Sequence, residues 1–221
     1  MTTSFDAVIF DCDGVIVDSE SLAWEAWALA LASEGYQLSD EDIRLGIGLP
    51  DSENLRYFKQ RVGIADDSSF WALLAEHTEQ LFTQRLQAFS DALETIRAVQ
   101  KMGALVGVAS NSVRRRLDES LSIAGVGELS RMSVAADEVA RPKPEPDLYL
   151  DAARKLGIVP TECVAVEDSP TGISAARAAG MVVFAVDRGY FSRDALAGAH
   201  VIGSTVTADG LSAAWRQGRG K

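Results

Sequence analysis

Two aspartates near the start of the chain are close enough together to bind a metal ion or to take part in catalysis. Asp11 and Asp13 directly follow the apolar run Ala7 to Phe10, and Gly14 comes next. Such a run is typical of a buried strand in a parallel sheet, and side chains at i and i+2 of an extended chain point the same way. Two like charges this close need a shared cation, or a proton on one of them. The pair predicts a hard-metal site, a nucleophile with a general acid/base, or both; a plain turn or helix cap is the alternative.

Three further groups of polar residues follow predicted strands. They are Ser110 and Asn111 after residues 104–109, Lys143 in the loop after residues 132–135, and Glu167 and Asp168 after residues 163–166. The carboxyl ends of parallel strands gather at one edge of a sheet, where ligands bind. Carboxylates select a hard cation such as Mg²⁺, whereas the serine, the backbone amides after it and the lysine suit a phosphate. Together the groups predict phosphoryl transfer through an aspartyl phosphate.

The elements that would position these residues alternate between strand and helix. This order predicts an α/β fold, a doubly wound, Rossmann-like parallel sheet. The order is interrupted after the first strand by a segment that is nearly all helix, in which Trp24, Trp27 and Leu31 form a stripe that favours a core role. We therefore expect a catalytic core of residues 1–17 and 86–221, with a small all-helical cap inserted at residues 18–85.

Helix ends can be predicted from local signals. A capping box begins a short helix at Ser39 to Asp42. Ser90 is expected to cap the helix that ends near Gly103, and Ser169 is expected to cap a helix with Pro170 in its first position.

Composition excludes several classes of function. The chain has 221 residues, and its formal net charge of -11 would repel nucleic acid and anionic membranes, so neither is expected as a partner. Two cysteines make no disulfide framework, and two histidines outside any motif argue against a histidine triad or a zinc site. Without a signal peptide or a transmembrane run, we expect a cytoplasmic protein. Its expected partner is a small phosphorylated molecule, and its expected state is a monomer.

Taken together, the motifs resemble the haloacid dehalogenase (HAD) superfamily. The similarity is greatest to the subgroup with a small helical cap, which includes β-phosphoglucomutase-like proteins and sugar-phosphate phosphatases. The segment Asp11 to Ser19 is similar to the first family motif, Ser110 to the second, Lys143 to the third, and Glu167 to Ser169 with Gly172 to the fourth. The resemblance covers almost the whole chain and implies a Mg²⁺-dependent phosphatase acting on a small metabolite, such as a sugar or sugar-acid phosphate.

The resemblance also implies roles for the catalytic and substrate-binding residues. Asp11 would be the nucleophile that forms the aspartyl phosphate. Asp13 would be the general acid for the leaving alcohol and then the base for water. Ser110 and Lys143 would bind the phosphoryl group, and Asn111 would line the pocket beneath the cap.

The resemblance also implies which residues would bind the metal ion. Mg²⁺ would be held by Asp11, by the backbone carbonyl of Asp13 and by Asp168. Glu167 would either bind the metal directly or contact the residues that bind it.

Other reactions of the superfamily fit less well. Dehalogenases lack the second aspartate of the first motif, so Asp13 argues against dehalogenation. Phosphonatases form a Schiff base with a cap lysine, and nothing in the sequence around Lys59 favours that role. β-Phosphoglucomutases carry a cap histidine and a cap arginine, where this chain has approximately Ala23 and a leucine of the loop at residues 45–50. A mutase is the alternative that stays open.

A phosphoacceptor module without turnover is the alternative from another class. Receiver domains also combine a doubly wound sheet with clustered aspartates and a lysine. They are much shorter, and they lack the helical insert and the acid/base aspartate two residues after the phosphoacceptor. Repeated release of phosphate by each chain would distinguish an enzyme from such a module.

Overall fold

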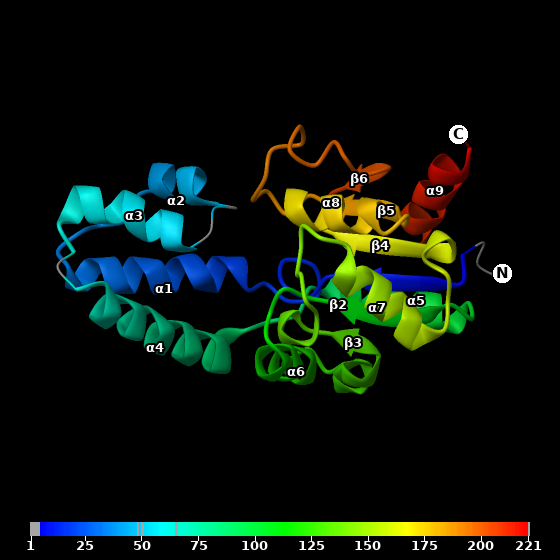
Figure 1. Ribbon diagram of the computed structural model, residues 1–221, viewed down its shortest axis with the longest axis horizontal. Coiled ribbons are helices and arrows are strands. Elements are labelled where there is room, and N and C mark those ends of the chain that lie inside the picture. The colour runs from blue at the N-terminus through cyan, green and yellow to red at the C-terminus, as the bar shows by residue number, and fades with distance from the viewer. Residues whose placement is uncertain (1–4, 48, 50, 65, 221) are drawn as a thin grey trace. The chain divides into compact units, whose positions relative to one another are not determined.

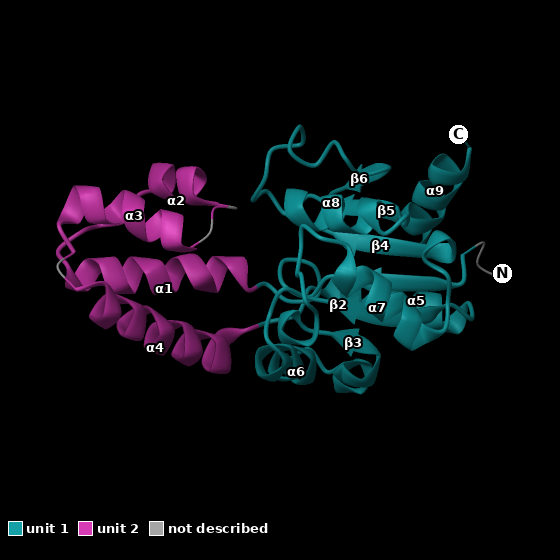
Figure 2. Cartoon of the chain, viewed as in Figure 1, with its two compact units in different colours: residues 1–18, 87–221 teal, residues 19–86 magenta. Residues whose placement is uncertain are grey.

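The computed structural model describes residues 5–47, 49, 51–64 and 66–220 (Figure 1). The chain divides into two compact units, the first of residues 1–18 and 87–221 and the second of residues 19–86 (Figure 2). In the loop at residues 45–50, Gly48 and Pro50 lie outside the described residues. Among the described residues, no helix is long and apolar enough to cross a membrane.

A parallel sheet forms the centre of the first unit. Its six strands have the order β3-β2-β1-β4-β5-β6, and every neighbouring pair is parallel. In the middle of the sheet, Ala7 of β1 is paired with both Leu105 and Cys163. The strands are β1 (Ala7–Phe10), β2 (Leu105–Ala109), β3 (Ser133–Val134), β4 (Cys163–Glu167), β5 (Val182–Val186) and β6 (Val201–Gly203). The predicted fold class is confirmed.

Both faces of the sheet are covered, which explains why its central strands are mainly apolar. Ala7 and Ile9 belong to a core cluster with residues of α7 and α8. The alternate residues Val8 and Phe10 are also fully buried and point to the opposite face. The described helices of this unit are α5 (Ser90–Lys101), α6 (Arg114–Ile123), α7 (Asp147–Leu156), α8 (Pro170–Ala178) and α9 (Ala208–Arg219), with short 3₁₀ helices η1 (Gly127–Met132), η2 (Ala136–Glu138) and η3 (Pro160–Glu162).

Of three local predictions, one is confirmed, one is confirmed with shorter bounds, and one is wrong. The strand expected at residues 132–135 is limited to Ser133–Val134, because η1 runs up to its start and η2 begins soon after it. Ser90 is the first residue of α5, and the extended Phe89 takes the capping position without a side-chain bond. Ser169 does cap α8, since its Oγ accepts the Gly172 N–H at 3.1 Å.

The second unit has a core of its own. Its described residues form α1 (Glu20–Ser33), α2 (Asp40–Gly46), α3 (Asp51–Val62) and α4 (Asp67–Arg85). Trp24, Trp27 and Leu31 are buried, as their helical spacing predicts. Trp27 packs against Phe58 and Phe70, with ring centroids 5.6 and 5.5 Å away. Such aromatic contacts add to the stability given by apolar burial.

The predicted capping box is present at the start of α2. The Asp42 N–H donates to Ser39 Oγ, and the Ser39 N–H donates to Asp42 Oδ2. The hydroxyls of Tyr36 and Tyr57 donate to the same carboxylate, each at 3.0 Å. Although burial of Asp42 opposes its ionisation, these hydrogen bonds lower the pKa of its carboxyl group.

We expect Asp42→Ala to lower the free energy of unfolding by about 2 to 4 kcal/mol, because a cap and several charge-assisted hydrogen bonds are lost. The folded pKa lies below the unfolded value of about 3.9, so this stabilisation is complete above the unfolded pKa and is lost as the pH falls through the folded pKa. Urea unfolding at neutral and at acidic pH measures both effects, and the difference from wild type should shrink in acid. Asp40→Ala, an exposed change in the same turn, should cost less than about 1 kcal/mol. Equal losses for the two variants would contradict the special role of Asp42.

Candidate active site

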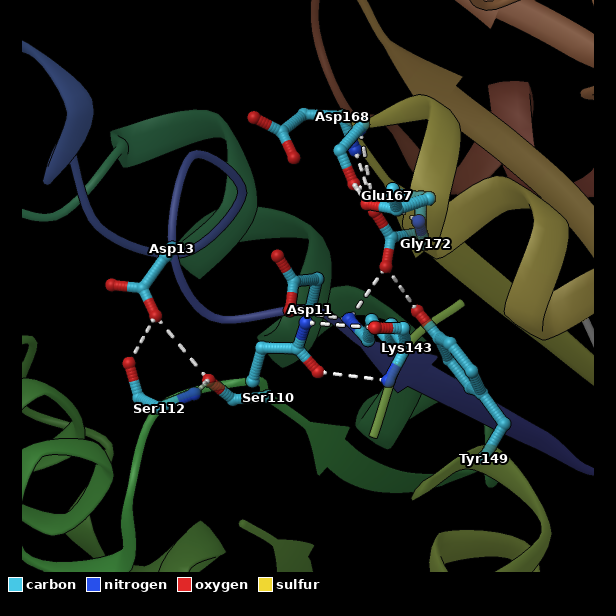
Figure 3. Close-up of polar contacts among 12 residues, drawn as sticks. Asp11, Asp13, Ser110, Ser112, Lys143, Tyr149, Glu167, Asp168 and Gly172 are labelled. Atoms are coloured by element: carbon cyan, nitrogen blue, oxygen red, sulfur yellow. Dashed lines mark hydrogen bonds and ion pairs between the residues drawn. The ribbon is translucent and has the colours of Figure 1, made fainter. Parts of the chain in front are cut away.

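Polar residues from separate strands lie together at the carboxyl edge of the sheet (Figure 3). Asp11 follows β1, Ser110 follows β2, and Glu167 and Asp168 lie at the end of β4. Lys143 comes from the loop between η2 and α7. All five side chains are buried, so each charge needs a compensating partner.

Lys143 joins two of the acidic residues. Its Nζ lies 2.6 Å from Asp11 Oδ1 and 2.6 Å from Glu167 Oε1. Burial disfavours the charged lysine, but the attraction of both carboxylates outweighs burial and raises the pKa of Lys143. The structure therefore places a buried ammonium directly beside Asp11.

The loop that carries Lys143 is fixed by side-chain contacts. Asn111 Oδ1 accepts the Lys143 N–H at 3.0 Å, and Asn111 Nδ2 donates to the Lys143 carbonyl at 3.3 Å. Arg141, in the same loop, forms an ion pair with Asp147 at 2.9 Å. Asn111 thus holds the lysine loop, and its contact with a substrate stays a prediction.

Glu167 is surrounded by hydrogen-bond donors. Its Oε1 accepts from Lys143 Nζ and from the Tyr149 hydroxyl, each at 2.6 Å. Its Oε2 accepts from the Asp168 N–H, the Ser169 N–H and Ser169 Oγ at 3.1, 3.3 and 3.0 Å. A carboxylate offers about four lone-pair positions, and these donors occupy them.

Asp13 has a different environment from Asp11. Its Oδ2 accepts hydrogen bonds from Ser112 Oγ at 2.8 Å and from Ser110 Oγ at 3.2 Å. β1 ends at Phe10, so Asp13 lies beyond the end of the strand. The two carboxylates therefore have different partners, one an ammonium and the other a pair of hydroxyls.

Two glycines leave room for the acidic side chains. A Cβ on Gly14, whose φ is 77°, would lie 1.9 Å from Asp168 Oδ2. A Cβ on Gly172 would lie 1.9 Å from Glu167 Oε1. Any larger residue at either position would displace a carboxylate.

The acidic residues fit a divalent cation. Oxygen atoms of Asp11, Glu167 and Asp168 lie within 4.8 Å of one another. Three carboxylates against the one ammonium of Lys143 leave an excess of negative charge in a buried region. Burial raises the pKa of Asp11 to about 8, although Lys143 acts in the opposite direction, and a bound cation would oppose the effect of burial. Oxygen donors of this kind suit Mg²⁺.

Two residues of this site, Ser112 and Tyr149, are not predicted from the sequence. Helical spacing places Tyr149 on the buried side of α7 with Leu148 and Ala152, but only the fold brings its hydroxyl to Glu167. Ser112 is a second hydroxyl in the loop after β2, which is the signal that could have indicated it.

Comparisons with known proteins place this chain beside one group of hydrolases. A family model for haloacid dehalogenase-like hydrolases matches residues 8–186. Hexitol phosphatase A of Escherichia coli (strain K12) is 36% identical over 186 residues, which are 81% of this chain and 82% of that protein. A solved HAD family hydrolase from Deinococcus radiodurans R1, with bound phosphate and sodium, has a TM-score of 0.82 and 34% identity, and the match covers 97% of this chain and 96% of that one.

A crystal structure of a putative β-phosphoglucomutase from Thermotoga maritima is also similar, with a TM-score of 0.79 and 28% identity over 94% of this chain and 96% of that one. The match with the family model spans most of the chain, and both solved structures share its fold. This chain therefore belongs to the haloacid dehalogenase-like hydrolase family.

Proposed function

We propose that this protein is a Mg²⁺-dependent phosphatase that hydrolyses a small phosphorylated sugar, sugar alcohol or sugar acid through an aspartyl phosphate on Asp11. The observation that carries the proposal is the buried contact of 2.6 Å between Asp11 and Lys143, with Asp13 accepting hydrogen bonds from two serine hydroxyls. A nucleophile beside a fixed cation, with a separate acid/base, is what transfer of a phosphoryl group to a carboxylate requires.

In the first half-reaction, a carboxylate oxygen of Asp11 would attack the phosphorus of the substrate. The bond from phosphorus to the alcohol oxygen breaks, and Asp13 would give that oxygen its proton. The ammonium of Lys143 and the hydroxyl of Ser110 would stabilise the negative charge on the phosphoryl oxygens. The products of this step are a free alcohol and an acyl phosphate on Asp11.

In the second half-reaction, Asp13 would act as the base. It would take a proton from water while the water oxygen bonds to the phosphorus of the acyl phosphate. The bond between phosphorus and Asp11 then breaks, which releases orthophosphate and restores both aspartates.

The residues that would hold Mg²⁺ are Asp11, Asp168 and the backbone carbonyl of Asp13. When bound, the cation would neutralise charge on the phosphoryl oxygens. We assign Glu167 to orienting Lys143 rather than to binding metal, because five protein donors surround its two oxygens.

The proposed substrate class is based on what similar proteins are named for. Hexitol phosphatase A is named for a sugar-alcohol phosphate, which supports a small polyhydroxylated substrate here. We further propose that the helical unit of residues 19–86 serves as a cap that excludes water during transfer.

The proposed function is tested by phosphate release from a panel of sugar, sugar-alcohol, sugar-acid and nucleoside monophosphates. We expect many turnovers per chain on a few sugar-like members. Release of a single equivalent would indicate a phosphoacceptor module. No release, combined with interconversion of sugar-phosphate isomers after a bisphosphate is added, would contradict the phosphatase and indicate a mutase.

Removal of metal gives a separate prediction. We expect chelator to lower turnover at least about 100-fold and Mg²⁺ to restore it, because the site has an excess of carboxylates. Calorimetric titration of Mg²⁺ should show at least about tenfold weaker binding by Asp168→Asn. Asp6→Asn, an exposed change at the other end of β1, should bind as wild type does. Full activity in excess chelator would exclude a metal requirement.

A further inference from the structure

Tyr149 brings a hydroxyl group into the apolar core of the first unit. The residue lies on α7, is fully buried, and belongs to the same core cluster as Ala152 and Ile173. A buried hydroxyl is unfavourable unless it is hydrogen-bonded, whereas phenylalanine would fill nearly the same space without that cost. The partner of this hydroxyl therefore indicates what the tyrosine contributes.

That partner is the oxygen atom that holds the lysine. The Tyr149 hydroxyl lies 2.6 Å from Glu167 Oε1, and Lys143 Nζ lies 2.6 Å from the same atom. Lys143 Nζ is also 5.0 Å from the centroid of the Tyr149 ring, within the range of a cation–π contact. Tyr149 thus contacts both Lys143 and Glu167, and Figure 3 shows its hydroxyl pointing to Glu167.

The two oxygens of Glu167 are held in different ways. Backbone N–H groups and the Ser169 hydroxyl fix Oε2 from within the turn after β4. Oε1 accepts from the flexible Lys143 side chain and from the Tyr149 hydroxyl. The phenol is rigid and packed in the core, so it can fix Oε1 where the lysine alone cannot.

We propose that Tyr149 is a positioning residue for phosphoryl transfer. Its hydroxyl fixes Glu167 Oε1, and this oxygen with the tyrosine ring keeps the Lys143 ammonium 2.6 Å from Asp11. The inference rests on the proposed function, because it takes Lys143 to be the group that stabilises the phosphoryl oxygens. Tyr149 itself acts through Lys143 and Glu167.

Tyr149→Phe is the direct test, since it removes the hydroxyl and keeps the ring. We expect kcat to fall about tenfold with KM changed less than about twofold, as for the loss of one charge-assisted hydrogen bond. Calorimetry with orthophosphate and Mg²⁺ should show affinity reduced about threefold or more. The midpoint of thermal unfolding should stay within a few degrees of wild type, because only one buried hydrogen bond is lost.

Tyr57→Phe is the matched control. It removes a phenol hydroxyl that donates to a carboxylate, Asp42, at 3.0 Å, but both residues of this pair belong to the second unit. We expect a modest loss of stability and a wild-type kcat.

A double-mutant cycle separates positioning from packing. If Tyr149 acts through the charge of Glu167, Tyr149→Phe should cost less than about twofold in a Glu167→Gln background. The proposal is overturned if Tyr149→Phe matches wild type in both kcat and phosphate affinity, if its cost is the same in both backgrounds, or if the variant no longer folds. A wild type without turnover would refute the phosphatase, while the phosphate titration would still test Tyr149.

Discussion

Asp11→Asn is expected to lower kcat by about 10⁴-fold or more, because an amide cannot form the acyl phosphate on which both half-reactions depend. The variant keeps the size of the side chain, and its amide oxygen can still accept from Lys143. It should therefore unfold cooperatively, and it should still bind the phosphorylated substrate.

The matched control for this prediction is Asp6→Asn. This exposed residue precedes β1 at the edge opposite the site, so the same chemical change is expected to leave kcat within about twofold. Steady-state phosphate release and substrate titration of both variants measure the effect. If a preparation of Asp11→Asn that contains no wild-type enzyme still shows appreciable turnover, the assignment of Asp11 as the nucleophile is overturned.

Asp13→Asn is expected to separate the two half-reactions. An alkyl phosphate needs a proton on its leaving oxygen, so its phosphoryl transfer should slow by about 10²- to 10⁴-fold. An activated aryl phosphate leaves without that help, so a burst of one equivalent of aryl alcohol should remain. The steady state after the burst should be slow, because Asp13 is also the base for water.

Rapid-mixing measurement of alcohol release from both substrates tests this assignment. The hydroxyls of Ser110 and Ser112 can still donate to the amide oxygen of the variant, so its position should be kept. Equal slowing of the aryl and alkyl bursts would contradict the role of Asp13 as the acid.

Much of the sheet and of the candidate site could be predicted, because polar residues directly follow the apolar runs that form the strands. Apolar runs followed at once by Asp11, Ser110 and Glu167 indicate a parallel sheet with one polar edge, and the structure has that sheet. The boundaries of β3 and α5 could not be predicted, because η1 and the extended Phe89 carry no distinct local signal.

Side-chain partners were harder to predict, because they depend on contacts distant in sequence. Asp13 meets Ser112 across 99 residues, and Tyr149 meets Glu167 from a neighbouring helix. The spacing of apolar residues within one helix or strand predicts which side of it is buried. It does not predict which atom of a distant segment will contact that side. The monomeric state and the cytoplasmic location stay predictions, because contacts within one chain do not depend on either.

The most direct measurement is to trap the acyl phosphate. Asp13→Asn would be mixed with an aryl phosphate and Mg²⁺, quenched in acid, and treated with borohydride, which reduces an aspartyl phosphate to homoserine. Peptide mass spectrometry should find homoserine at position 11, and none in a sample without substrate. An aryl burst of one equivalent with unmodified Asp11, or with homoserine at another position, would contradict covalent catalysis by Asp11.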